Sequence, residues 1–154
     1  MKVFIDTNVI LEYLMQREHF SEAERALDYL QDGGHIMYMS VGGFYTILFI
    51  MEKFLKKEMR MEKQERTAKL RAVMSKLLDS FVVAEHNKDS LISAMADRGF
   101  TDLEDSCQYQ LAERSGCNVL ITFNMDDYIG VKHSAVNVMG PGSFMVMIQT
   151  KTFN

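Results

Sequence analysis

Three acidic positions in this sequence are spaced so that they could share a cation. They are Asp6, Asp105 (with Asp102 three residues before it) and Asp127. Carboxylates gathered in one place raise one another's pKa unless a positive charge neutralises them. A site of oxygen atoms suits Mg²⁺ or Mn²⁺, which keep several waters and recruit phosphate oxygens. Such a set predicts hydrolysis of a phosphodiester bond, because the metal lowers the pKa of its bound water and stabilises charge on the phosphate.

Each of these acids, taken alone, has a simpler explanation. Asp6 precedes Thr7 and then apolar residues at helical spacing, so Asp6 or Thr7 could merely cap a helix. Asp102 and Asp105 both fall in the first turn of a predicted helix, where the dipole and free N–H groups favour acids. We therefore expect Asp102 to support the site without binding metal, and the cation hypothesis requires the three positions to meet at one place.

Strands and helices alternate along the chain. Apolar runs predict strands at 3–5, 35–39, 81–84, 117–122 and 135–139, and helical spacing predicts helices between them, including 20–31, 42–55, 88–97 and 143–151. This alternation predicts an α/β fold in one domain spanning 1–154, a three-layer sandwich with a central parallel sheet of four to five strands and helices on both faces. Ligands bind beyond the carboxyl ends of such strands, where Asp6 and Asp127 would lie.

Two predicted helices begin next to polar residues that could cap them. Ser40 is expected to cap the helix at 42–55, and Thr101 the helix at 101–116. In the second helix, spacing assigns the inner face to Leu103, Ser106, Cys107, Gln110 and Leu111, and leaves Asp102, Asp105 and Tyr109 on a neighbouring face.

The basic residues are concentrated in one part of a chain whose net charge is −4. Nine of the 17 lysines and arginines fall in one predicted helical stretch: Lys53, Lys56, Lys57, Arg60, Lys63, Arg66, Lys69, Arg71 and Lys76. Interleaved glutamates favour an ordinary solvated face with i,i+4 ion pairs. The alternative is a surface that contacts phosphates, with Lys57, Arg60, Lys63 and Arg66 as the candidate phosphate contacts.

The cysteines and the hydropathy pattern bear on the compartment. Cys107 and Cys117 fit neither a metal-ligand spacing nor a disulfide framework, which indicates a reducing cytosol. No apolar run is long enough to cross a bilayer, and the N-terminus lacks the apolar core of a signal peptide. We therefore expect a cytoplasmic protein without a membrane partner.

Several short motifs resemble those of the PIN-domain nucleases. They are FIDTNVILEYLMQRE at 4–18, TDLEDSCQYQLA at 101–112 and LITFNMDDY at 120–128, together with MSVGGFYTILFI at 39–50 and MGPGSF at 139–144. Their order extends over nearly the whole chain, and the sequence looks most like the VapC-like endoribonucleases, the toxins of type II toxin–antitoxin pairs. The resemblance implies a PIN-like fold, cleavage of RNA with Mg²⁺ or Mn²⁺, a homodimer and a cognate antitoxin.

The resemblance also implies roles for particular residues. Asp6, Asp105 and Asp127 match the family's metal-binding and catalytic acids, and the last acidic position could fall at Asn124 or Asp127. The residues that match polar groups hydrogen-bonded around the family's site are Thr7, Asn8 and Thr122.

One family position is not acidic in this chain. In the helix that Ser40 opens, the family usually has a glutamate where this sequence has Thr46, and Glu52 lies about two turns too far along. This departure leaves weak activity, altered metal dependence and loss of catalysis all open. A catalytically weakened module that binds RNA or protein is therefore the alternative function.

One other class of enzyme has an aspartate at the end of its first strand, and this sequence fits that class poorly. Phosphatases that form an aspartyl-phosphate need a second acid where this chain has Asn8, and they need a lysine near a later acid.

A group of apolar residues could supply a surface for a second copy or for an antitoxin beside the second to fourth helices. They are Phe44, Tyr45, Phe49 and the methionines of 37–61. The alternative is that these residues belong to the core.

Overall fold

The computed structural model describes residues 1–131 and 135–152, and only the backbone of 151 and 152. Five parallel strands form the central sheet in the order β3-β2-β1-β4-β5. They are β1 (Lys2–Ile5), β2 (Ile36–Ser40), β3 (Phe81–Ala84), β4 (Val119–Ile121) and β5 (Asn137–Met139). The predicted parallel sheet of four to five strands is confirmed.

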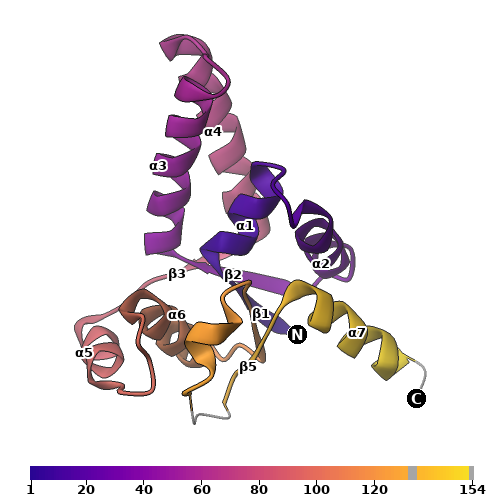
Figure 1. The fold of residues 1–154 in the computed structure, drawn as a ribbon, viewed down its shortest axis with the longest axis vertical. Helices are drawn as coiled ribbons and strands as arrows, with labels where there is room; N and C mark the ends of the chain where they lie inside the picture. Colours follow the sequence, from indigo (N-terminus) through magenta and orange to yellow (C-terminus); the bar gives the residue numbers. More distant parts are fainter. Residues whose placement is uncertain (132–134, 153–154) are drawn as a thin grey trace.

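Helices cover both faces of this sheet, because strand side chains alternate between two apolar cores. Val3, Ile5 and Ile121 face the larger core, which α1 (Thr7–Leu14), α2 (Phe20–Asp32), α3 (Val41–Lys57), α4 (Lys63–Ser80) and α7 (Pro141–Thr152) cover. Phe4 and Leu120 face the smaller core with α6 (Leu103–Arg114), and α5 (Lys88–Ala96) packs against α6. Figure 1 shows the resulting three layers, with α5 and α6 below the sheet. The predicted sandwich is confirmed.

The basic stretch forms parts of two helices and the turn between them, which corrects the prediction of one helical stretch. Helix α3 ends at Lys57 and α4 begins at Lys63, and the two run side by side as a hairpin that projects from the sheet (Figure 1). The chain reverses through Arg60, whose φ of 51° is left-handed. A sequence without glycine or proline at this turn lacks the usual signal for a helix end.

Helix α6 differs from its prediction at its cap and on its inner face. Asp102, not Thr101, caps the helix, because its side chain accepts hydrogen bonds from the amides of Glu104 and Asp105. Tyr109 is fully buried and Leu103 is 51% exposed, the reverse of the predicted faces. The helix packs against the sheet on one side and α5 on another, so its buried residues do not form one apolar stripe.

The strand order reverses at β1, which lies between β2 and β4. At the carboxyl ends of these strands, the Asp6 amide donates to the carbonyl of Ile121 at 3.0 Å. Asp6 and Thr122 therefore lie side by side at the switch point, where sheets of this kind bind ligands. No helix in the described part of the chain is both long and apolar enough to cross a membrane.

Candidate metal and catalytic site

The carboxylate of Asp6 is buried at the end of β1 and is held by three side chains. Asp6 is 3% exposed and occupies the N-cap position of α1, yet its side chain makes no capping hydrogen bond. Its Oδ2 accepts from the Thr122 hydroxyl at 2.6 Å and from Asn8 Nδ2 at 2.8 Å. Its Oδ1 accepts from Gln108 Nε2 at 2.9 Å. The explanation of Asp6 as a mere helix cap is therefore wrong.

Two of the expected supporting residues, Asn8 and Thr122, connect Asp6 with the chain after β4. Asn8 Nδ2 also donates to the Thr122 hydroxyl at 3.2 Å, and Asn8 Oδ1 accepts from the Phe123 amide at 3.2 Å. The Thr122 hydroxyl in turn accepts from the Asn124 amide at 2.9 Å. The start of α1 and the segment after β4 are thus fixed to one another.

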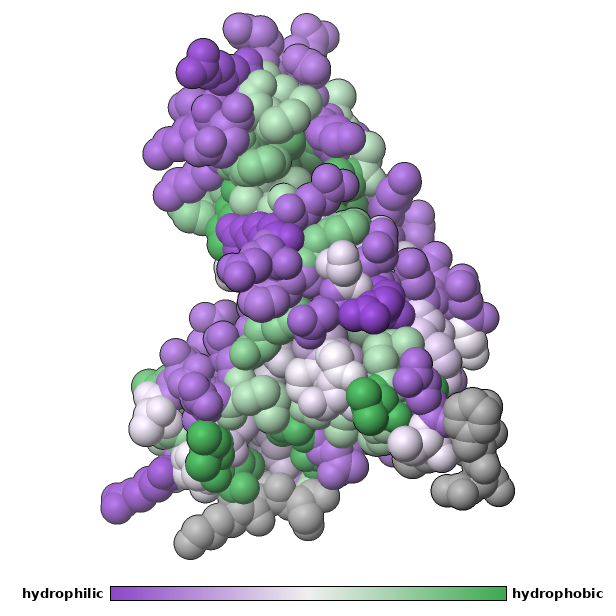
Figure 2. Space-filling model, turned by 45° about the vertical axis from the view of Figure 1, so that its right-hand side comes forward, coloured by the Kyte–Doolittle hydropathy of each residue, from purple (hydrophilic) through white to green (hydrophobic). Residues whose placement is uncertain are grey.

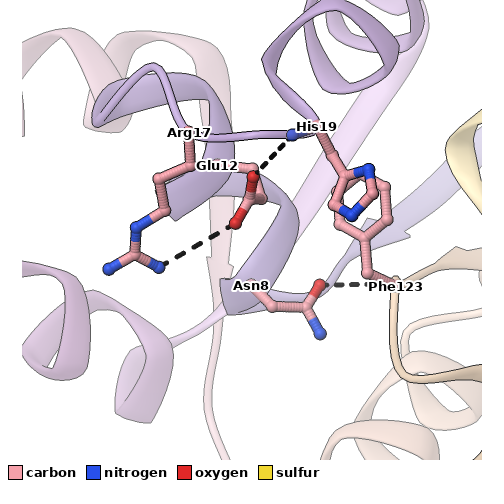
Figure 3. A network of polar contacts seen from close by, with 5 residues as sticks. All are labelled: Asn8, Glu12, Arg17, His19 and Phe123. Carbon is pink, nitrogen blue, oxygen red and sulfur yellow. Dashed lines mark hydrogen bonds and ion pairs between the residues drawn. The ribbon is translucent and has the colours of Figure 1, made fainter.

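A further set of contacts, shown in Figure 3, extends this connection along α1. Glu12, one turn after Asn8, accepts from the His19 amide at 3.0 Å and lies 4.0 Å from Arg17. The His19 ring stacks on Phe123 with 5.0 Å between ring centroids. The polar end of α1 and the loop beside it therefore share one packed unit with the segment after β4.

Asp105 lies in the first turn of α6 and is 4% exposed. Its Oδ1 accepts from the Tyr128 hydroxyl at 3.3 Å. Its Oδ2 is buried and lacks a hydrogen-bond partner within the described residues. A buried carboxylate oxygen without a partner is costly, so this atom is available to a ligand that offers positive charge or a proton.

Negative charges surround Asp105 and change its protonation. Burial, and then the charges of Asp6, Asp102 and Asp127, raise the pKa of Asp105 from 3.8 to about 7. Burial also raises the pKa of Asp6, while hydrogen bonds from Thr122 and Gln108 and the nearby amides of Asn8 and Thr7 act against it. The charges that act on Asp105 are all negative, which is the environment a bound cation would relieve.

Asp127 lies in η1 (Met125–Tyr128), a short 3₁₀ helix after β4. It is half-buried, whereas Asn124 before it is exposed. Tyr128, the last residue of η1, is buried, and burial followed by the charges of Asp6 and Asp105 raises its pKa well above the ordinary value. The Tyr128 hydroxyl therefore stays protonated and acts as a donor.

The oxygen atoms fit a hard divalent cation in kind, but their arrangement is not that of a formed metal site. Within 1–131 and 135–152, no three His, Cys, Asp or Glu side chains are placed to hold a metal ion. Two observations favour Mg²⁺ or Mn²⁺: the donors are all oxygen atoms, and Asp105 Oδ2 has no hydrogen-bond partner in the part of the chain that the structure describes. Shared metal binding by Asp6, Asp105 and Asp127 stays a prediction.

Thr46 lies half-buried on α3, at the position where a glutamate was expected. The predicted cap of this helix is confirmed, because Ser40 Oγ accepts from the Gly43 amide at 2.8 Å. Gly43 lets α3 approach α1 closely, since a Cβ atom there would lie 2.6 Å from Thr7 Oγ1. Thr7 is buried at this helix contact.

The candidate RNA contacts lie away from the acids, at the tip of the hairpin (Figure 1), and this tip is hydrophilic in Figure 2. Lys57, Arg60 and Lys63 are exposed there. Arg66 is only 11% exposed, donates to the carbonyl of Met61 at 3.1 Å and lies 3.8 Å from Glu52. Arg66 thus fastens the hairpin and has little surface left for a phosphate.

Two residues of the site were missed from the sequence, Gln108 and Tyr128. Gln108 follows Asp105 at i+3, and Tyr128 directly follows Asp127. On a helix, i+3 places two side chains on the same face, so the position of Gln108 was a usable signal.

The sequence and the fold both match known proteins. The PIN domain family matches residues 2–126. Ribonuclease VapC1 of Aquifex aeolicus (strain VF5) is 25% identical over 129 residues, which cover 82% of this chain and 84% of that protein.

Two solved structures have a similar fold. One is the crystal structure of VapBC2 from Rickettsia felis bound to a DNA fragment from their promoter, with a TM-score of 0.63, 11% identity, and coverage of 91% of this chain and 98% of the matched chain. The other is VapBC-1 from nontypeable Haemophilus influenzae, with a TM-score of 0.60, 18% identity, and coverage of 92% and 99%. With a family match over most of its length and a buried acid at the switch point of the matching fold, the chain belongs to the PIN domain family.

Proposed function

We propose that this chain is a metal-dependent endoribonuclease and the toxin of a type II toxin–antitoxin pair. Asp6, Asp105 and Asp127 would hold Mg²⁺ or Mn²⁺ at the carboxyl end of the sheet. The observation that carries the proposal is the buried Oδ2 of Asp105, which has no hydrogen-bond partner among the described residues and lies in surroundings that raise the pKa of Asp105 to about 7. The ribonuclease name of the Aquifex aeolicus relative supports RNA as the substrate.

A divalent cation bound there supplies a water of lowered pKa and stabilises negative charge on the phosphate. The chain's own residues prepare the site. Thr122, Asn8 and Gln108 favour the ionised form of Asp6 and fix both of its oxygens. Asp105 exchanges a proton near neutral pH, and Tyr128 donates to its Oδ1.

A second candidate function is a PIN-like module that binds RNA or protein without efficient cleavage. Thr46 favours it, because a hydroxyl replaces a carboxylate and leaves fewer negative ligands for a metal.

The test is cleavage of a labelled RNA with Mg²⁺ or Mn²⁺. We expect cleavage to stop in EDTA and in Asp6→Asn, and to continue in Asp32→Asn, which changes an exposed acid at the end of α2. RNA that binds equally well to the unmodified chain and Asp6→Asn, without cleavage by either, would favour the binding module.

The partners belong to the same proposal. The similar solved structures are VapBC assemblies, which supports an antitoxin as the partner. A pocket of about 550 Å³ between α1, α2 and α4 offers half-buried apolar side chains, among them Tyr13, Leu14 and Val73. We expect this chain to co-purify with an antitoxin encoded beside it. Val73→Asp, which changes a half-buried residue of the pocket wall on α4, should weaken that complex.

A homodimer is also proposed. Tyr45 and Phe49 on α3 are 65% and 58% exposed, whereas Phe44 packs against the core and Met37, Met39 and Met51 are buried in it. Two exposed aromatic side chains at i,i+4 form a surface that a second copy could cover. A monomer by light scattering at micromolar concentration would contradict the dimer.

A further inference from the structure

Gln108 is a buried amide that joins α6, the helix of Asp105, to Asp6 at the end of β1. It lies one turn after Asp105 on α6 and is 4% exposed. Its Nε2 donates to Asp6 Oδ1 at 2.9 Å, across 102 positions of sequence. The other two side-chain donors to Asp6, Asn8 and Thr122, both contact Oδ2. Gln108 is therefore the contact that fixes the second oxygen.

The orientation of the Gln108 amide follows from its partner. An ionised carboxylate oxygen only accepts hydrogen bonds, so the NH₂ group must face Asp6. The amide oxygen Oε1 then points elsewhere, and it is buried without a hydrogen-bond partner among the described residues. This buried acceptor is a cost to the fold, and the bond that Nε2 donates to Asp6 is the contact that offsets it, so the glutamine acts at this place through Asp6.

We propose that Gln108 is a positioning residue that sets the orientation of the Asp6 carboxylate relative to Asp105. This inference rests on the proposed metal-dependent cleavage. Without Gln108, the contacts of Asn8 and Thr122 with Oδ2 still hold one oxygen, but the carboxylate can rotate about that anchor. Asp6 Oδ1 would then no longer keep a fixed place relative to α6, which carries Asp105.

The test replaces Gln108 with methionine, which is unbranched, similar in length and without an amide. Gln110→Met is the matched control, because Gln110 lies on the same helix, is half-buried and donates weakly to Asp97 at 3.4 Å. Binding of Mn²⁺ alone is measured by calorimetry. We expect Gln108→Met to weaken Mn²⁺ binding about 10–100-fold, the usual effect of losing a group that orients a metal ligand.

Two further measurements separate positioning from a general structural role. In RNA cleavage, Gln108→Met should lower kcat and raise the Mn²⁺ concentration for half-maximal rate, with an unchanged KM for RNA. Its melting temperature should change by only a few degrees, because Asp6 Oδ1 loses a donor while a buried acceptor without a partner among the described residues is also removed. Gln110→Met should match the unmodified chain in metal binding and cleavage.

The outcomes distinguish this inference from the proposed function. An unmodified chain that shows no metal-dependent cleavage refutes the proposed function. Metal binding and cleavage by Gln108→Met equal to those of the unmodified chain refute the positioning role alone. A crystal structure of Gln108→Met with the Asp6 carboxylate in the same rotamer also refutes it, whether or not the chain cleaves RNA.

Discussion

Replacing Asp105 with asparagine should stabilise the metal-free protein at pH 8, although it removes a residue of the proposed site. Burial and the charges of Asp6, Asp102 and Asp127 raise the pKa of Asp105 from 3.8 to about 7 in the folded protein. The unfolded chain ionises this carboxyl near the ordinary value. Between these two values the folded protein holds a proton that the unfolded chain has lost, so stability falls as the pH rises.

The gap between the two pKa values sets the size of the effect. The difference between 3.8 and about 7 corresponds to a loss of about 4 kcal/mol in the free energy of unfolding, as an upper limit. This loss is complete above pH 7. Asp102 is exposed, so solvent screens part of the repulsion and we expect about 2 kcal/mol. Asparagine keeps the shape and cannot ionise. The melting temperature of Asp105→Asn at pH 8 should exceed that of the unmodified chain by about 4–8 °C for a domain of this size.

The assay is thermal unfolding followed by circular dichroism in EDTA at several pH values from 5 to 8. The unmodified chain should lose stability across this range, and Asp105→Asn should show a flatter profile. Asp32→Asn, an exposed change on α2, should keep the unmodified profile. Added Mn²⁺ should restore stability to the unmodified chain and not to Asp105→Asn. Parallel pH profiles, or a variant that melts below the unmodified chain at pH 8, would refute this reasoning.

Three further predictions follow from other parts of the structure. Asp102→Ala should lower stability by about 1 kcal/mol through loss of the α6 cap and leave measurable cleavage, whereas Asp105→Ala should abolish cleavage; equal loss in both would contradict the separate roles. Gly43→Ala should cost about 1–3 kcal/mol in urea unfolding, because its Cβ would meet a buried hydroxyl of α1 at 2.6 Å, and an unchanged unfolding midpoint would contradict this contact. The double variant Lys57→Ala/Arg60→Ala should weaken binding to all RNAs alike and lower the slope of log affinity against log salt by about one to two; an unchanged slope would return the hairpin tip to an ordinary solvated surface.

The sheet could be predicted from sequence because its strands are buried and strongly apolar. Runs such as 117–122 indicate strands, and an acid after such a run indicates a strand end. The turn at 58–62 could not be predicted in the same way. The reversal through Arg60 depends on tertiary contacts, including the bond from Arg66 to the Met61 carbonyl, and no glycine or proline marks it.

The candidate site was predicted in part. The motif likeness pointed to Asp6, Asn8 and Thr122, and the structure brings their side chains together. Gln108 was missed because a glutamine on a helix is usually solvated, and its burial depends on the position of Asp6, 102 residues away. Tyr109 was assigned to the wrong face because α6 is covered on more than one side.

The long sequence separation of the contacts that hold Asp6 bears on the order of folding. Gln108 and Thr122 lie 102 and 116 positions from it. Contacts between such distant residues form late, because closing the intervening chain costs entropy before the contacts compensate for it. The ribosome releases Asp6 first, and its carboxylate remains hydrated until β4 and α6 have emerged. A site arranged in this way is incomplete in the growing chain and forms only with the second half of the sheet.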